Sequence, residues 1–204
     1  MSSREQILNA LRGNVRERYD MPDLSEITPI VFDDPVEQFI KKATTTAGAK
    51  LVEMEPGDSI DELVRRAYPD AKIIASNVAG VSAQLNPDTV ETAQALAAAD
   101  VGVIAGAIGV AENACIWIPQ TMKEKAVCFA SEYLVILLHK QDIVSNMHEA
   151  YARIEASDEY FQQYKFGTFI SGPSKTADIE SALVYGAQAA RGVTIVLEPL
   201  VNGG

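Results

Sequence analysis

The sequence has few cysteines and no recognisable spacing of metal-binding residues. Two cysteines, Cys115 and Cys128, occur among 204 residues, which is too few for a disulfide framework in a chain of this length. Each lies in an apolar run, ACIWIP or AVCFA, as small buried packing residues do. His139 and His148 could complete a two-Cys, two-His set, but no CxxC or HxxxH spacing supports one. We therefore expect no metal site.

Long apolar runs and a surplus of positive charge are also missing. No stretch reaches eighteen apolar residues, and the first residues lack the apolar region of a signal peptide. Seventeen Lys and Arg face 28 Asp and Glu, which leaves a formal charge of −11. Such a surface repels nucleic-acid phosphates and anionic lipid. We therefore expect a cytoplasmic protein that binds neither nucleic acid nor membrane.

The first nineteen residues are the one basic stretch. They carry a net charge of +2, from four arginines and two glutamates (Arg4, Arg12, Arg16 and Arg18; Glu5 and Glu17). Apolar residues recur between these charges at helical spacing, which predicts an amphipathic helix over residues 3–19 with a solvated basic face. A short helix cannot bury its apolar stripe alone. We expect residues 1–33 to form an N-terminal arm that docks on residues 34–204 or on a partner.

Residues 34–204 have the composition and patterning of one α/β domain. With 48% hydrophobic and 22% charged residues, the chain has ample apolar surface for a core. Apolar runs of strand length alternate with helical patterns, which predicts βαβ units in a three-layer α/β/α domain with a largely parallel sheet. The predicted helices are 34–48, 59–68, 86–99, 142–156 and 176–190; the predicted strands are 50–54, 72–76, 99–106, one ending at Pro119, 126–130, 133–138, 167–171 and 193–200.

The strongest local signal for a ligand site is the segment GTFISGPSKTADIE, residues 167–180. A predicted strand leads through Gly172 into a predicted helix, and in open α/β sheets ligands bind beyond the carboxyl ends of the strands. A helix N-terminus there would offer free N–H groups to an anion. Ser174 and Thr176 add hydroxyl groups and Lys175 a cation, which suits a carboxylate or a phosphate. Alternatively, Thr176 caps the helix, Asp178 complements its dipole and Lys175 is an ordinary surface lysine.

A second signal is the segment ADVGVIAGAIGVAENA, residues 99–114. Its glycines at 102, 106 and 109 do not match the GxGxxG fingerprint of dinucleotide-binding folds. Glu112 follows a predicted strand and a glycine-rich turn, so we expect it at the carboxyl edge of the sheet. It could serve as a nucleophile or base, or its carboxylate could hold loop N–H groups. Asp100 is interpreted as a structural cap, and His139, at a strand end, as a candidate for the same edge.

Two blocks of the sequence resemble the LUD-domain family of lactate-utilisation proteins, above all its short LutC/YkgG-like members. The family hallmark G-P-S-[RK]-T-A-D-I-E is matched by GPSKTADIE, residues 172–180. The block from Ala99 to Pro119 resembles the family stretch A-D-x-G-[IV]-x-x-A-x-x-[AG]-[IV]-A-E-[TS]-G, with Glu112 on its glutamate. The resemblance spans roughly residues 35–200.

This chain departs from the family pattern at two places. The family has G-x-H-G-P before the last strand, whereas this chain has Gly186-Ala187-Gln188-Ala189-Ala190, so that Gln188 replaces a histidine. Asn113 and Ala114 stand where [TS]-G is expected. The loss of an imidazole removes an acid–base group, although Gln188 can still form hydrogen bonds to a ligand.

The resemblance implies a fold like that of ribose-5-phosphate isomerases, glucosamine-6-phosphate deaminases and CoA transferases. It also implies a role in oxidising L-lactate to pyruvate alongside iron–sulfur partner proteins. Two cysteines cannot supply the four thiolates of an iron–sulfur cluster, so we expect the clusters in the partners and no cofactor in this chain.

Three functions stay open at this point. The first is an accessory subunit that binds a small carboxylate, phosphate or partner loop through Glu112, Ser174, Lys175, Thr176 and Gln188. The second is a free-standing enzyme of the CoA-transferase or sugar-phosphate-isomerase kind, with Glu112 as nucleophile or base. The third is a non-catalytic interaction protein whose site has decayed, and a homo-oligomer is compatible with each.

Overall fold

A five-stranded parallel sheet forms the centre of the protein in the computed structural model, which describes residues 2–15, 17, 19–20, 22–23, 26–157, 166–177 and 182–199. Its strands lie in the order β1-β11-β6-β3-β2, and every neighbouring pair is parallel. This confirms the predicted class, an α/β domain with a largely parallel sheet. The strands are β1 (Lys50–Glu53), β11 (Gly192–Glu198), β6 (Tyr133–His139), β3 (Val101–Ala105) and β2 (Ile74–Ser76).

A second, four-stranded sheet was not anticipated as a separate unit. It has the order β7-β4-β5-β8, with β4 antiparallel to β5, β5 antiparallel to β8, and β4 parallel to β7. The glycines of residues 99–114 allow it to pack closely on the central sheet. A Cβ at Gly106 would lie 2.4 Å from Ile116 Cγ2, and one at Gly109 would lie 2.7 Å from Leu138 Cδ2. The strands are β7 (Ile143–Val144), β4 (Ile108–Val110), β5 (Cys115–Pro119) and β8 (Gly167–Ile170).

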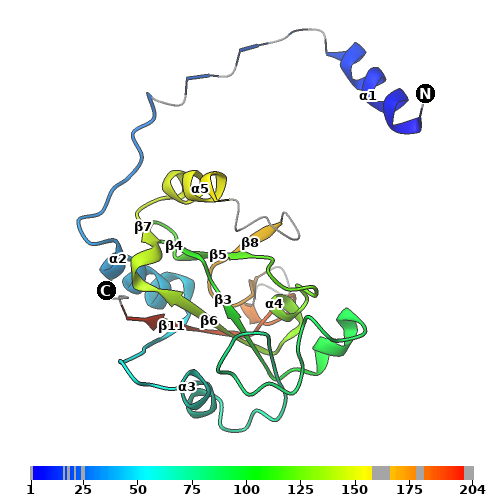
Figure 1. Cartoon of the computed structure of the whole chain (residues 1–204). Helices are drawn as coiled ribbons and strands as arrows, with labels where there is room; N and C mark the ends of the chain where they lie inside the picture. The colour runs from blue at the N-terminus through cyan, green and yellow to red at the C-terminus, as the bar shows by residue number, and fades with distance from the viewer. Residues whose placement is uncertain are drawn as a thin grey trace.

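The layers enclose three apolar cores. On one face of the central sheet, α3 (Ile60–Ala67) contributes Leu63 and Val64 to a core that includes Val103 and Val135. On the other face, α2 (Pro35–Lys42) and the second sheet enclose the largest core, around Phe39. Helix α5 (Met147–Ala156) covers the outer face of the second sheet through Ala150 and Ile154. Figure 1 shows α3 and α5 on opposite sides of the sheets.

The helix predicted over residues 34–48 begins and ends where the sequence indicates. The Asp34 side chain accepts the Glu37 N–H at 2.9 Å, and Pro35 occupies the first helical position. The helix continues as a π-helical turn, η2 (Ala43–Ala47), and ends at Gly48 with a left-handed φ of 76°. Ser59 caps α3 in the same way as Asp34 caps α2, by accepting the Glu62 N–H.

Four predicted elements differ in the structure. Residues 126–130, expected as a strand, form the short helix α4 (Val127–Ala130). The helix expected from residue 142 begins only at Met147, with Asn146 as its cap, after the turn η4 (Lys140–Asp142) and β7. The helix expected over residues 176–190 is wrong for its described residues, where β9 (Lys175–Thr176) pairs antiparallel with β10 (Val184–Tyr185). Of the helix predicted over residues 86–99, only the 3-10 segment η3 (Ala93–Ala98) forms.

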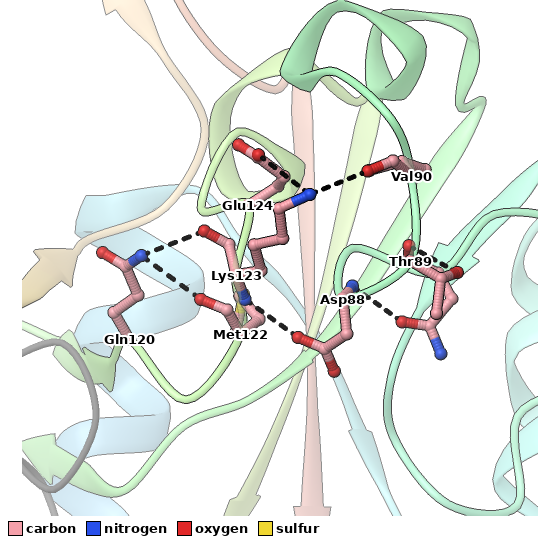
Figure 2. Close-up of polar contacts among 8 residues, drawn as sticks. Asp88, Thr89, Val90, Gln120, Met122, Lys123 and Glu124 are labelled. Carbon is pink, nitrogen blue, oxygen red and sulfur yellow. Dashed lines mark hydrogen bonds and ion pairs between the residues drawn. The ribbon is translucent and has the colours of Figure 1, made fainter.

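Asp88 explains why residues 86–92 form a loop. Its carboxylate accepts the Lys123 N–H at 2.8 Å and the Asn77 side-chain amide at 3.0 Å, while Lys123 Nζ donates to the carbonyl oxygen of Val90 at 3.1 Å. Figure 2 shows how this network joins the loop to the segment that holds Gln120 and Met122. The bond from Lys123 Nζ satisfies the carbonyl group of Val90, which a helix would satisfy locally.

The N-terminal helix α1 (Ser3–Asn14) is shorter than predicted but begins as expected. Ser2 and Glu5 form a reciprocal capping box. No residue of α1 is buried, and Figure 1 shows the helix standing away from the sheets. Among the described residues, no helix has the length and apolar character to cross a membrane.

Candidate functional site

One surface hollow gathers four of the predicted ligand-binding residues. It has a volume of about 390 Å³, and Gly172, Ser174, Lys175 and Gln188 all line it. The apolar walls of the hollow come from α4 and from residues near the amino ends of the central strands β6 and β11. Segments far apart in the sequence, 169–175 and 188–190, thus face a common space. We refer to it below as the Ser174 pocket.

The Ser174 pocket lies at the amino ends of the central strands, not at the carboxyl edge where we expected the site. Its walls include Leu134, the second residue of β6, and Val193, the second residue of β11. The expectation is wrong because β8, the strand before Gly172, belongs to the second sheet, in which it runs antiparallel to β5. The carboxyl end of β8 therefore does not mark the carboxyl edge of the central sheet.

The loop after β8 is held in place by contacts to three other segments. Ser171 Oγ donates to the carbonyl oxygen of Asn113 at 2.9 Å, and the Ser174 N–H donates to that of Ala190 at 2.9 Å. Gly172 has a φ of +65°, and a Cβ there would lie 2.3 Å from the carbonyl oxygen of Ala47. Glycine at this position is therefore required both by backbone conformation and by close packing on η2.

Lys175 contacts the carboxyl end of a helix. Its Nζ donates to the carbonyl oxygens of Thr46 at 3.3 Å and Ala47 at 2.5 Å. These are carbonyl groups at the end of η2, where a cation complements both the unpaired acceptors and the helix dipole. An ammonium group has three N–H donors, and these two contacts use two of them.

The described residues around Thr176 do not form the helix N-terminus at which we predicted an anion site. Thr176 lies in β9 and pairs with Val184, so it does not cap a helix. Asp178 lies outside the described residues. The polar groups that remain for a ligand are the Ser174 hydroxyl, the Gln188 amide and the third N–H of Lys175.

Glu112 and Asn113 lie beside the Ser174 pocket but do not line it. They occupy the turn between β4 and β5, where the Glu112 N–H donates to the carbonyl oxygen of Ser145 at 3.1 Å. Asn113 Oδ1 accepts the Cys115 N–H at 3.1 Å, and the Asn113 carbonyl receives the Ser171 hydroxyl. The half-buried Glu112 side chain accepts no hydrogen bond from the described residues. The turn thus supports the pocket through Ser171.

The other two candidates have structural or remote positions. Asp100 is a cap, as interpreted from the sequence, because Oδ2 accepts the N–H groups of Ile73 at 2.8 Å and Lys72 at 2.7 Å. These bonds hold the pKa of the Asp100 carboxyl below its usual value. His139 lies at the carboxyl end of β6, with Nδ1 3.4 Å from Glu198 Oε2. It is roughly 17 Å along the strand from Leu134.

Cys128 and Phe129 line the Ser174 pocket and were not predicted as site residues. Their run, AVCFA, was interpreted as a strand, and a short apolar run alone does not distinguish a strand from a helical turn. Burial raises the pKa of Cys128 to about 12, and that of Cys115 to about 12 as well. Such thiols stay protonated at neutral pH and are inert.

The described side chains do not suit a metal or an iron–sulfur cluster. No group of three or more His, Cys, Asp or Glu side chains among them could hold a metal ion. An iron–sulfur cluster needs thiolates, whereas both thiols here are buried in apolar surroundings that favour the protonated form.

Comparisons with known proteins identify the family. The family model described as LUD domain matches residues 34–197, more than half of the chain. A solved structure, described as a DUF162 family protein from Deinococcus radiodurans, has a TM-score of 0.62 at 12% identity, over 83% of this chain and 99% of that one. This likeness supports the three-layer α/β/α fold. A search of curated proteins found no match. The chain belongs to the LUD domain family.

Proposed function

We propose that this chain is a LutC-like subunit of an L-lactate utilisation system, in which iron–sulfur partner proteins carry the electrons and the Ser174 pocket binds a small carboxylate. The family supports the lactate context. The observation that carries the ligand class is that Ser174, Lys175 and Gln188 line one pocket although they come from both sides of the β9–β10 hairpin.

The pocket has the polar and apolar groups that lactate or pyruvate requires. A carboxylate accepts hydrogen bonds from the Ser174 hydroxyl, the Gln188 amide and the remaining N–H of Lys175. The methyl group of the ligand packs against the apolar wall made by Leu134 and Val193. The chain therefore binds and orients a small acid, and the iron–sulfur clusters of the partners would accept the two electrons that leave when lactate becomes pyruvate.

A free-standing enzyme with Glu112 as nucleophile has less support. Glu112 does not line the Ser174 pocket, and a hydrogen bond from Ser171 to Asn113 joins its turn to the pocket. Changing Glu112 to Gln should therefore leave ligand binding unaltered. Abolished turnover in that variant, in the absence of any partner protein, would favour the enzyme instead.

Thermal unfolding in the presence of small acids tests the ligand. L-lactate and pyruvate at 10 mM should raise the Tm of the wild-type chain and not that of Gln188→Ala or Ser174→Ala. Gln94→Ala, at a position that does not line the pocket, serves as the matched control and should respond like the wild type. If no carboxylate or phosphate shifts the Tm of the wild type, the pocket is not an anion site, and the chain acts as an interaction protein.

A further inference from the structure

A second hollow adjoins the Ser174 pocket. It has a volume of about 270 Å³, and Phe129, Gln188 and Ala189 line both it and the pocket. Among the described residues that line the two hollows, the cations are Lys175 in the pocket and Arg191 in the second hollow. The second hollow thus brings a further positive charge to the border of the pocket.

Lys175 has only part of its ammonium available to a carboxylate, because the carbonyl oxygens of Thr46 and Ala47 already accept from it. An ammonium is also a point charge. A guanidinium instead offers a planar pair of N–H donors that matches the two oxygens of a carboxylate. Arg191 supplies that geometry next to the pocket.

The guanidinium of Arg191 can reach a ligand in the pocket. The Gly186 N–H donates to the carbonyl oxygen of Ser174 at 3.0 Å, and a Cβ at Gly186 would lie 2.5 Å from Arg191 Cβ. With the lengths of the intervening bonds, Arg191 Cβ lies no more than about 9 Å from the Ser174 carbonyl oxygen. An extended arginine side chain spans about 5 Å from Cβ to Cζ, and its N–H groups bond acceptors about 3 Å further out. The two reaches match.

The Ser174 pocket has room for this side chain beside a small acid. Its volume of about 390 Å³ is in the range of about 300–1,000 Å³ that is typical of pockets for drug-sized ligands. Lactate and pyruvate are much smaller than such ligands, so they leave part of the pocket unfilled. The side chain of Arg191 can occupy that part and pair with the carboxylate.

Arg191 is paired with Glu132 in the structure without a ligand. Nη1 of Arg191 lies 2.9 Å from Glu132 Oε1, and its Cζ lies 5.3 Å from the centroid of the Tyr133 ring. The two side chains of the ion pair are 57% and 47% exposed, and exposed pairs contribute little to stability because water screens them. The Arg191 N–H also donates to the carbonyl oxygen of Glu132, which fixes the backbone. Only a side-chain rotation is needed for Arg191 to change its partner, and such rotations are common on binding.

We propose that Arg191 leaves Glu132 and binds the carboxylate of a ligand in the Ser174 pocket, so that Glu132 and the ligand compete for one guanidinium. Arg191 then determines the preference of the pocket for acids over neutral molecules of the same shape. This inference rests on the proposed function, because it concerns the same pocket and the same class of ligand.

Equilibrium dialysis of the full chain against radiolabelled L-lactate tests the role of Arg191. Arg191→Gln should weaken lactate binding about tenfold or more, whereas binding of lactamide, which has the same shape and no charge, should stay the same. A merely structural role would weaken both. Arg191→Lys keeps the charge and should recover part of the affinity. The matched control is Arg65→Gln, because Arg65 forms an exposed ion pair with Asp61 and lines neither hollow. It should bind lactate like the wild type.

A double-mutant cycle tests the competition. Glu132→Gln should strengthen lactate binding by about two- to fivefold, because the ion pair that it removes is worth no more than that. The gain should vanish in the Arg191→Gln background if Glu132 acts through Arg191. A gain that persists there comes from the charge of Glu132 alone and would overturn the proposal.

The same measurements separate this proposal from the proposed function. Equal affinity of the wild type and Arg191→Gln for lactate would overturn the role of Arg191 and leave the carboxylate site in place. A wild type that binds neither lactate nor pyruvate would overturn both. Circular dichroism confirms that each variant is folded.

Discussion

The ammonium of Lys175 lies 2.5 Å from the carbonyl oxygen of Ala47, at the end of the helical segment that precedes β1. Gly172 and Lys175 of the family hallmark GPSKTADIE thus contact the distant end of η2 at Ala47, and both also line the pocket. Lys175 thus makes a structural contact, in addition to the ligand-binding role that we propose for it.

Removal of the Lys175 ammonium should destabilise the protein even without a ligand. Lys175→Met keeps the apolar stem but leaves the carbonyl groups of Thr46 and Ala47 without their cationic donor, which we expect to cost about 1–2 kcal/mol. That corresponds to a Tm lower by about 2–8 °C for a chain of this size. Differential scanning fluorimetry without added acids measures the change. An unchanged Tm would mean that Lys175 serves the ligand alone.

Gly172 should tolerate no side chain. Gly172→Ala places a Cβ 2.3 Å from the carbonyl oxygen of Ala47 at a φ of +65°, so steric overlap adds to the backbone cost, and we expect a loss of about 2 kcal/mol or more. Gly80→Ala is the matched control, because Gly80 has a similar φ of +82° and nothing within 4 Å of its Cβ position. It should lose only about 1 kcal/mol. Equal losses in urea denaturation would show that packing on η2 contributes nothing.

Asp100 makes the stability depend on acidic pH. Because the N–H groups of Ile73 and Lys72 hold its pKa below the usual value, the ionised carboxylate stabilises the folded state above the unfolded pKa of about 3.9. This contribution is lost as the pH falls through the lower folded pKa. Asp100→Ala should cost about 1 kcal/mol at pH 7, and its deficit relative to the wild type should shrink in acid. A deficit that is constant from pH 7 to pH 3 would contradict this origin.

The two thiols should react only after unfolding. Burial raises the pKa of both Cys115 and Cys128 to about 12, so almost no thiolate is present at pH 8. A chromogenic disulfide reagent should titrate no thiol in the native protein and two in guanidinium. Since the folded state favours the neutral thiols, stability should fall as the pH rises from the unfolded pKa of about 8.5 towards 12. Rapid reaction of one thiol in the native state would place it at the surface.

Capping residues and apolar runs in the sequence correctly predicted one helix and one central strand. Asp34, Pro35 and Gly48 mark both ends of one helix, and the apolar run of residues 133–138 forms the buried strand β6. The pattern TADIESALVYG has helical periodicity, but Thr176 pairs with Val184 in a hairpin, so tertiary context overrides local preference. The second sheet was not predicted because its strands β7 and β4, with two and three residues, are too short to show a pattern in the sequence.

The sequence predicted several residues of the candidate pocket, but it did not predict which other segments these residues contact. Of the five residues that the accessory-subunit hypothesis named, Ser174, Lys175 and Gln188 share a pocket, whereas Glu112 and Thr176 do not line it. The carbonyl groups that Lys175 contacts lie near the other end of the sequence, on η2, and no local pattern indicates them. Glu112 has the residue type of a nucleophile, but it does not line the pocket, and its N–H donates to the carbonyl oxygen of Ser145.

Anaerobic affinity purification of the tagged full chain from its native cell tests the central claim most directly. A LutC-like subunit should bring down proteins in fixed stoichiometry whose iron and acid-labile sulfide match iron–sulfur clusters, and the complex should reduce an electron acceptor when L-lactate is added. If the chain is purified alone and without iron, with lactate-oxidising activity remaining in the unbound fraction, it is not a subunit of that system.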